Sequence, residues 1–500
     1  MQIKNGRHMI NNERHIVAID LGSSKVSVTV AKVNGQDIQV VYYKESPSAG
    51  IRYSSIYNDM HVKNTLEKVI REAENELGIK ITQAVVGMPK FPVRQERSDA
   101  TMYERKDEEI TPEDIAALKS FAQSLYPIED QSKEAIYGSV AQSFSDGENF
   151  QIIEEDIIGM SSTALEGSFK IFIGKKAGLT KIDSVMDKVG VVPMRKYFTA
   201  ESTARAVLTD AEMENGVALI DFGGGSTSVS IYQGKIMRHF ASIPFGGKNI
   251  TADIKSECQI SERLAENIKL EYGACMPDKL LNLSDKILDI VGGETSKQLP
   301  VKYLSEIITA RVEEIMMAVF YEIENSGFAD SLRSGIVVTG GCAQTANLCN
   351  LIYDLSGYKA RIGYPQRRFS CEGCDGIAGT SAATAAGLIM ACASETELNC
   401  TLTGESGLKA EPVTEDIGVV GTKEDPQGKI FKEGQIEVVE PKEKVKVKKE
   451  KRFGLKIRKF GETLGGVLDF AYNIVNEDVN ASAQNVVSEQ DNEDEENEKA

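Results

Sequence analysis

The sequence predicts an α/β protein made of two related lobes, and two observations point to this class. The chain has 500 residues, which is more than one ordinary hydrophobic core accommodates, so several structural units are expected. The stretch AIDLGSSKVSVTVAKVNG, which begins at residue 18, also resembles LIDFGGGSTSVSIYQGKI, which begins at residue 219. This offset of 201 residues is too long for a solenoid repeat. It indicates two lobes that each begin with the same strand–turn–strand hairpin.

The remaining elements follow from hydrophobic spacing and from helix-capping residues. Residues 15–33 read as two strands around a Gly/Ser turn, and residues 61–77 place apolar side chains at helical spacing. A buried strand is expected at 83–89, and a helix at 109–125 with Thr111 as its N-cap. Further strands are expected at 135–144, 150–157, 167–174 and 335–339, and a further helix at 181–190.

The charge of the chain argues against nucleic acid as a partner. Lys and Arg number 57 and Asp and Glu number 75, whereas general nucleic-acid binding needs a basic surface. The N-terminal residues contain no apolar stretch typical of a signal peptide, and no run reaches the roughly 18 apolar residues of a spanning helix. The sequence therefore predicts a cytoplasmic protein whose membrane contacts are peripheral.

The two Gly-rich hairpins carry the first chemical signal. A Gly-rich bend lets consecutive backbone N–H groups point into one concavity, which suits phosphate oxygens. Neither loop has the GxxxxGK[ST] pattern of a P-loop, and each loop alone is also compatible with an ordinary hairpin turn. Their paired occurrence favours phosphate binding. The predicted phosphate-binding residues are Gly22, Ser23, Ser24 and Lys25 in the first hairpin and Gly223, Gly224, Gly225, Ser226 and Thr227 in the second.

Two carboxylates accompany these loops. Asp20 and Asp221 each end a buried strand, and they would face the same gap if the lobes are related by a twofold axis. Two carboxylates near phosphates are natural holders of a hydrated Mg²⁺, which keeps several of its waters. A third glycine cluster, SGIVVTGGCAQTANL (334–348), runs from a strand into Gly340 and Gly341. Glycines there would let a flat group approach the backbone.

The order of the three motifs points to a known superfamily. AIDLGSSK, LIDFGGGST and GIVVTGG resemble the two phosphate motifs and the adenosine motif of the actin/Hsp70/sugar-kinase ATPases. Within that superfamily, RHFASIPFGGKNITADI (238–254), SERLAENIKLEYG (261–273) and YKARIGYP (358–365) resemble segments of the FtsA family of bacterial cell-division proteins. The resemblance implies an actin-like two-lobed ATPase fold with duplicated β-sheet lobes. It also implies ATP and Mg²⁺ as cofactors.

Further site residues are carried over from this resemblance. Glu266 and Lys269 would contact the ribose and adenine, and Gly340 and Gly341 would lie under the adenosine. Glu201 would orient the attacking water. In the family the acidic residue is usually followed by Pro, whereas this chain has Ser there, so hydrolysis is less supported than binding. A carboxylate favoured by the dipole of a helix N-terminus is the alternative interpretation of Glu201.

The resemblance also implies a division into domains, with an inserted subdomain that mediates contacts along a filament. The predicted units are a disordered lead (1–14), the first lobe core 1A (15–85 and 171–212), the inserted subdomain 1C (86–170), the second lobe core 2A (213–247 and 327–390), subdomain 2B (248–326), a flexible linker (391–450), an amphipathic helix (451–475) and an acidic disordered tail (476–500).

The segment 451–475, KRFGLKIRKFGETLGGVLDFAYNIV, is a basic stretch in an acidic chain. Its four glycines each cost about 1 kcal/mol of helix relative to Ala, so we expect a helix on lipid rather than in water. A helix that docks on a partner protein is the open alternative. The residues predicted to contact anionic lipids are the apolar Phe453, Ile457, Phe460, Leu464, Val467 and Leu468 and the basic Lys451, Arg452, Arg458 and Lys459.

An FtsA-like chain would be an adaptor rather than primarily an enzyme. It would form filaments and bind the C-terminal tail of FtsZ through its second lobe. It would tether the FtsZ ring to the cytoplasmic face of the cell membrane at the division site and help to recruit other divisome proteins. ATPase activity is expected to be weak at most. The alternatives are an actin-like pilus-assembly ATPase and an enzyme of the Hsp70 or sugar-kinase type, which would lack the basic C-terminal segment.

Overall fold

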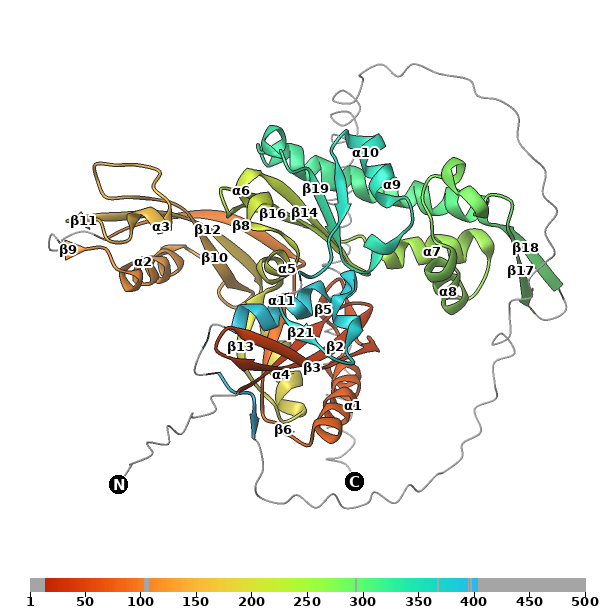
Figure 1. The fold of residues 1–500 in the computed structure, drawn as a ribbon, viewed down its shortest axis with the longest axis horizontal. Coiled ribbons are helices and arrows are strands. Elements are labelled where there is room, and N and C mark those ends of the chain that lie inside the picture. The colour runs from red at the N-terminus through yellow and green to blue at the C-terminus, as the bar shows by residue number, and fades with distance from the viewer. Residues whose placement is uncertain are drawn as a thin grey trace, which may run out of the picture.

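The computed structural model describes residues 14–102, 108–292, 295–366, 368–393, 395 and 398–402. Its two largest sheets form the centres of two lobes (Figure 1). The sheet of the first lobe has six strands in the order β13-β7-β1-β2-β3-β21. These strands are β1 (Arg14–Leu21), β2 (Lys25–Asn34), β3 (Asp37–Pro47), β7 (Gln83–Met88), β13 (Val192–Phe198) and β21 (Ser370–Cys371).

Helices pack on both sides of this sheet. Helix α1 (Asp59–Leu77) packs on β2 and β3 beside α4 (Lys176–Lys188), and both form where the sequence predicts helices. Asn58 caps α1 by accepting a 3.1 Å hydrogen bond from the His61 N–H, as a short polar side chain at the N-cap is expected to do. Helices α5 (Thr199–Val207) and α11 (Ala383–Cys392) pack together on the side toward the second lobe (Figure 1).

The second lobe repeats the same design. Its five-stranded sheet has the order β16-β15-β14-β19-β20. Asp20 pairs with Ser27 across the first hairpin and Asp221 pairs with Ser228 across the second, so the offset of 201 residues holds on both strands. The predicted duplication of the lobes is therefore confirmed. The strands are β14 (Val217–Phe222), β15 (Thr227–Gln233), β16 (Ile236–Ile243), β19 (Ile336–Thr339) and β20 (Ala360–Ile362).

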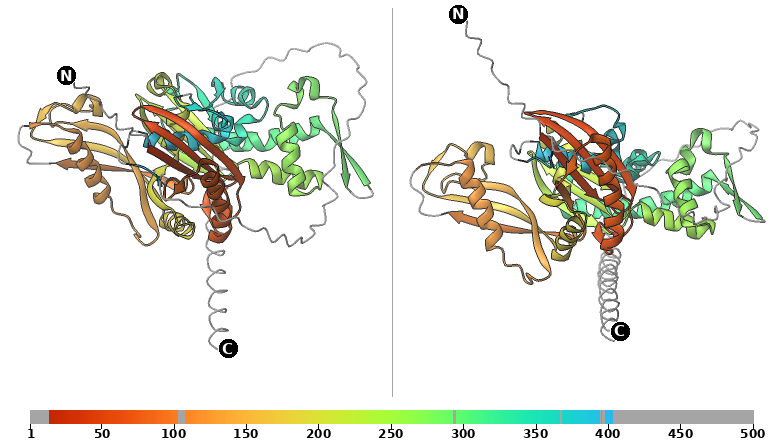
Figure 2. Two further views of the ribbon diagram at one scale, coloured as in Figure 1. Left: turned by 60° about the horizontal axis from the view of Figure 1, so that its bottom comes forward. Right: turned by 90° about the horizontal axis from the view of Figure 1, so that it is seen from below.

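The second lobe extends away from the first through helices and a hairpin, which lie at one end of the molecule (Figure 2). Helices α7 and α9 pack against each other, and α9 carries buried apolar side chains along its whole length. The elements of this extension are α7 (Gly247–Cys258), α8 (Glu262–Tyr272), β17 (Ile287–Gly292), β18 (Thr295–Pro300) and α9 (Val301–Asn325). Closer to the sheet, α6 (Asp210–Asn215) contacts β15 and α10 (Leu348–Ser356) contacts β20.

A three-stranded sheet in the order β10-β12-β8 lies at the opposite end (Figure 2). It has a separate core that includes Leu118, Phe144 and Phe169, as expected for an inserted unit. The predicted Thr111 N-cap is confirmed within a full capping box. The elements are β8 (Val93–Met102), β9 (Glu108–Glu109), α2 (Pro112–Leu125), β10 (Glu134–Ser145), α3 (Glu154–Ile157), β11 (Ser161–Ser162) and β12 (Leu165–Lys175).

Two sequence predictions need correction. The expected strand at 150–157 is wrong, because Glu154–Ile157 forms one helical turn whose three leading acids suit a helix N-terminus. The linker was expected to begin at residue 391, yet α11 runs to Cys392 and β22 (Thr401–Leu402) pairs with β6 (Lys80–Ile81). Among the residues that the structure describes, no helix is long and apolar enough to span a membrane. The predicted membrane segment 451–475 lies outside the described residues.

Candidate functional site

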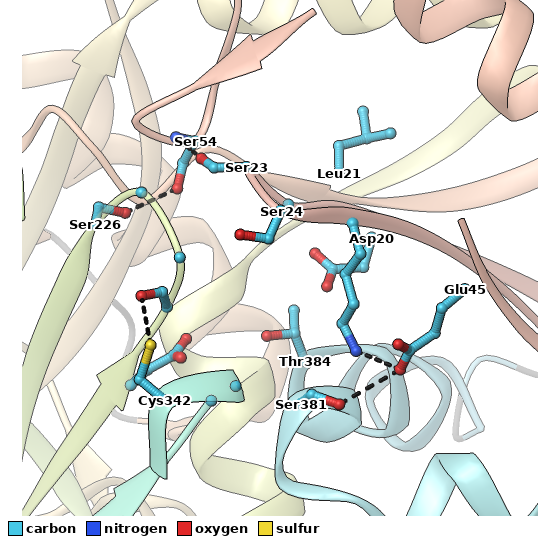
Figure 3. Close-up of a pocket in the computed structure, with 18 of the residues that line it drawn as sticks. Asp20, Leu21, Ser23, Ser24, Glu45, Ser54, Ser226, Cys342, Ser381 and Thr384 are labelled. Atoms are coloured by element: carbon cyan, nitrogen blue, oxygen red, sulfur yellow. Dashed lines mark hydrogen bonds and ion pairs between the residues drawn. The ribbon is translucent and has the colours of Figure 1, made fainter. Parts of the chain in front are cut away.

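A cavity of about 660 Å³ opens between the two lobes. The hairpin turns that follow β1 and β14 and the turn after β19 contribute to its lining (Figure 3). Helix α8 also contributes to the lining. Segments from both lobes therefore meet around one space. The predicted site residues that line it are Asp20, Gly22, Ser23, Ser24, Lys25, Asp221, Gly223, Gly224, Gly225, Ser226, Glu266, Lys269, Gly340 and Gly341.

The two Gly-rich loops have the same backbone closure. The N–H of Gly22 donates to the carbonyl oxygen of Lys25 at 3.0 Å, and the N–H of Gly223 donates to that of Ser226 at 3.2 Å. The loops also touch each other across the cleft. A Cβ atom on Gly224 would lie 1.8 Å from Ser24 Oγ, so this position needs glycine for the close approach of the two loops.

The two carboxylates differ in their charged surroundings. Burial raises the pKa of Asp20 to about 6, and the positive charges of Lys25 and Lys90 oppose that shift without cancelling it. Asp221 is buried and forms an ion pair with Lys90, which lies two residues after β7 in the first lobe. Lys25 pairs instead with Glu45, on its own lobe. Two lysines, Lys25 and Lys90, therefore lie close to the two carboxylates in the cleft.

Helix α8 lines another part of the cavity. Lys269 Nζ lies 2.8 Å from Glu266 Oε2 and 3.1 Å from the carbonyl oxygen of Gly247, so it ties α8 to the first turn of α7. Leu270 lines the same cavity with 73% of its surface exposed. Two polar groups beside an exposed apolar side chain suit a ligand that has both a polar and a flat apolar part.

The turn after β19 closes on the end of β14. Gly340 has a φ of +90°, which side chains other than glycine rarely adopt. A Cβ atom there would also lie 2.5 Å from the carbonyl oxygen of Phe222 and 2.7 Å from Asp221 Oδ1. The close approach that the structure describes is that of Gly340 to the end of β14, and the predicted approach of a flat ligand group to this turn stays a prediction.

Comparisons with known proteins decide the family. The family model described as cell division protein FtsA matches residues 218–387. The chain is 30% identical over 361 residues to the cell division protein FtsA of Neisseria meningitidis, covering 72% of this chain and 86% of that protein. The chain belongs to the FtsA family. It is also 28% identical over 384 residues to the FtsA protein of Pseudomonas aeruginosa, covering 76% and 90% of the two chains.

The fold comparison agrees with this FtsA assignment. A solved structure described as a PilM-PilN type IV pilus biogenesis complex superposes with a TM-score of 0.53 at 12% identity, over 76% of this chain and 98% of that one. At this identity the likeness shows the fold alone. The FtsA-family chain therefore has the expected actin-like two-lobed fold, and its membership of the family gives it a role in cell division.

Two predicted site residues do not line the cavity of this FtsA-family protein. Thr227 is fully buried as the first residue of β15, and its hydroxyl donates to the carbonyl oxygen of Phe245 at 2.8 Å. Glu201 is not among the lining residues, whereas Thr199, two positions earlier on α5, is. Two residues correspond to about 200° around a helix, so the two side chains point to different sides. The charged groups that act on Glu201 are Lys119 and Arg205.

Sequence reasoning missed several residues that line this cleft, among them Lys90, Leu270 and Ser54. Lys90 follows the predicted strand 83–89 directly, and a cation at the end of a strand beside a Gly-rich loop was the available signal. Leu270 stood next to the predicted Lys269 as an apolar residue among polar ones. Ser54 reaches the cleft from a short hairpin, and nothing in its local sequence marks it.

Proposed function

We propose that this FtsA-family chain binds ATP in the cleft between its lobes. The observation that carries the proposal is that two duplicated Gly-rich loops and two strand-end carboxylates, 201 residues apart in sequence, line one cavity. The loops supply backbone N–H groups and the hydroxyls of Ser23, Ser24 and Ser226 for phosphate oxygens. Glu266 and Lys269 suit the ribose and adenine, and Leu270 offers an apolar surface to the base.

The acidic centre of the cleft fits Mg²⁺ bound with the nucleotide. Asp20 and Asp221 come from the two lobes, and Asp221 already faces one cationic group, the Lys90 ammonium. Bound there, the ion would neutralise phosphate charge. Glu201 lies outside the cavity lining, so we assign it no catalytic step. The proposal is therefore nucleotide binding, with at most weak hydrolysis.

Gly224 offers a sharp test of nucleotide binding. Gly224→Asp places a carboxylate between the two loops and should weaken ATP binding more than tenfold through repulsion of phosphate. Gly224→Asn has the same size without the charge and separates crowding from repulsion. Isothermal titration calorimetry with ATP and Mg²⁺ compares the two variants. An Asp variant that bound ATP as tightly as the wild-type chain would remove the second loop from the phosphate site.

We further propose that the chain acts as a filament-forming adaptor for the division machinery. Its membership of the FtsA family and its actin-like fold support this role. In the proposal, subdomain 1C (86–170) mediates contacts between copies, and subdomain 2B (248–326) binds the tail of FtsZ. The segment 451–475 then holds the assembly on anionic lipids at the cytoplasmic face of the membrane.

The chain provides a matched control for the membrane part of this proposal. Residues 451–475 and 476–500 are segments of equal length, but the first is basic and apolar and the second is acidic. Deletion of 451–475 should abolish co-sedimentation with vesicles that contain anionic phosphatidylglycerol, because it removes the basic and apolar side chains together. Deletion of 476–500 should preserve it. Equal sedimentation of the 451–475 deletion and the full chain would refute the tether.

A further inference from the structure

A two-residue turn, Tyr53–Ser54, reaches the contact between the two Gly-rich loops (Figure 3). It joins strands β4 (Ile51–Arg52) and β5 (Ser55–Ile56), which pair with each other. Ile51 and Ile56 are 2% and 4% exposed and belong to the core of the first lobe. The strands on either side of the turn are therefore anchored in the core, and the turn itself reaches the cleft.

The backbone of this turn is unusual for the residues it contains. Tyr53 has a φ of +46° and Ser54 a φ of +61°, so two consecutive side chains occupy the left-handed region. Two-residue hairpin loops of this kind favour Asn-Gly or similar pairs. Residues held in such conformations persist where the surroundings fix them, and they gather at ligand clamps and switch regions. Here the surroundings are the two loops proposed to bind phosphate.

Ser54 contacts both loops at once. Its backbone N–H donates to Ser23 Oγ at 2.8 Å, and its hydroxyl shares a 3.0 Å hydrogen bond with Ser226 Oγ. Ser23 is 6% exposed and Ser226 is 1% exposed, so water has little access to either residue. Ser54 thus contacts a hydroxyl from each lobe, and both hydroxyls are assigned above to phosphate. Ser23 Oγ accepts the N–H bond, so its own O–H stays free to donate, whereas the O–H of Ser226 is engaged when it donates to Ser54 Oγ.

We propose that Ser54 is a specificity-determining residue, whose hydroxyl competes with the terminal phosphate of a nucleoside triphosphate for Ser226. This inference rests on the proposed nucleotide site. With the base proposed at α8, the phosphate chain extends toward the two loops. We place its last phosphate nearest to the hairpin tip because Ser54 contacts both of these loops. A charged phosphate oxygen accepts a stronger hydrogen bond than a hydroxyl does, so a triphosphate displaces Ser54. A diphosphate is one group shorter and leaves the Ser54–Ser226 bond in place.

The competition predicts an effect on ATP but not on ADP. Ser54→Ala removes the competing hydroxyl and keeps the backbone N–H, so ATP should bind about 2- to 10-fold tighter, the range set by one net hydrogen bond. ADP affinity should stay within about twofold. Ser55→Ala is the matched control, because the Ser55 hydroxyl donates to the Phe91 carbonyl oxygen at 3.1 Å and Ser55 does not line the cavity. It should change neither affinity.

Isothermal titration calorimetry of the full chain and its variants with ATP and with ADP measures these changes. Ser54→Gly suits the positive φ and also lacks the hydroxyl, so it should shift the ATP-to-ADP ratio as Ser54→Ala does. An unchanged ratio in both variants would overturn the competition. Weaker ATP binding would overturn it as well, because Ser54 would then be a phosphate ligand. Failure of the wild-type chain to bind either nucleotide would overturn the nucleotide site itself, and the inference with it.

Discussion

The two Gly-rich loops share a backbone but differ in how their charges are neutralised. Each loop follows a strand whose next-to-last residue is Asp, and each closes with the same N–H to carbonyl hydrogen bond. In the first lobe, Lys25 lies on the loop and pairs with Glu45 of the same lobe. The second loop has no cation of its own, and Asp221 is neutralised by Lys90 from the opposite lobe. The two lobes thus share the backbone geometry of the loop. They differ in that the Lys90–Asp221 ion pair joins the lobes, whereas the Lys25–Glu45 ion pair lies within one lobe.

Because the two ion pairs differ in burial, we expect them to contribute differently to the free energy of unfolding. The side chains of Lys90 and Asp221 are 14% and 13% exposed, whereas those of Lys25 and Glu45 are 21% and 36% exposed. Removing one partner of a buried pair leaves an uncompensated charge, whereas exposed pairs contribute little. The comparison therefore predicts that the same chemical change has unequal effects in the two lobes.

The largest effect is expected for Lys90→Met. It should lower the free energy of unfolding of the nucleotide-free protein by about 3 kcal/mol, because Asp221 then lies buried without a counter-ion. Lys25→Met is the matched change in the first lobe and should cost about 1 kcal/mol or less. Chemical denaturation followed by circular dichroism measures both.

A double variant shows whether the loss comes from the unpaired carboxylate. Lys90→Met combined with Asp221→Asn removes both charges and should recover most of the stability lost in the single variant. If Lys90→Met and Lys25→Met lowered the free energy of unfolding equally, the inference that the ion pair between the lobes contributes more than the pair within one lobe would be wrong.

The duplicated part of the site was predictable from sequence. A strand, a glycine bend and a second strand form a local sequence pattern, and this pattern occurs twice, 201 residues apart. Asp20, Asp221 and the loop glycines were found in this way, and the structure brings them together. Gly340 was also recognised, from its position after a buried strand, and it lines the same cavity.

The residues that connect the lobes were not predictable in the same way. Lys90 and Ser54 reach the cleft through tertiary packing, and their partners lie 131 and 172 residues away in sequence. The Tyr53–Ser54 turn also lacks the glycine that would mark such a hairpin. Glu201 lies outside the cavity lining for a different reason. Its type and position in the chain matched a family pattern, but the rotation of α5 presents Thr199 to the cavity instead.

A smaller effect on stability is expected from the titration of Asp20. The pKa of Asp20 in the folded protein is about 6, above its ordinary value of 3.8, because burial disfavours the charged form. The folded state therefore holds this proton more tightly than the unfolded state. The stability that comes from protonated Asp20 is complete below pH 3.8 and is lost as the pH rises through about 6.

Asp20→Asn should remove this dependence. The variant and the wild-type chain should be about equally stable near pH 4, and the variant should be more stable at pH 8 by at most about 3 kcal/mol. Thermal melting across this range, without nucleotide, measures the difference. Mg²⁺ with ATP should reverse the order, because the proposed cation needs the ionised carboxylate that burial disfavours in the empty cleft. A variant that remained the more stable form with Mg²⁺ and ATP would exclude Asp20 from the cation site and leave Asp221 as its remaining carboxylate.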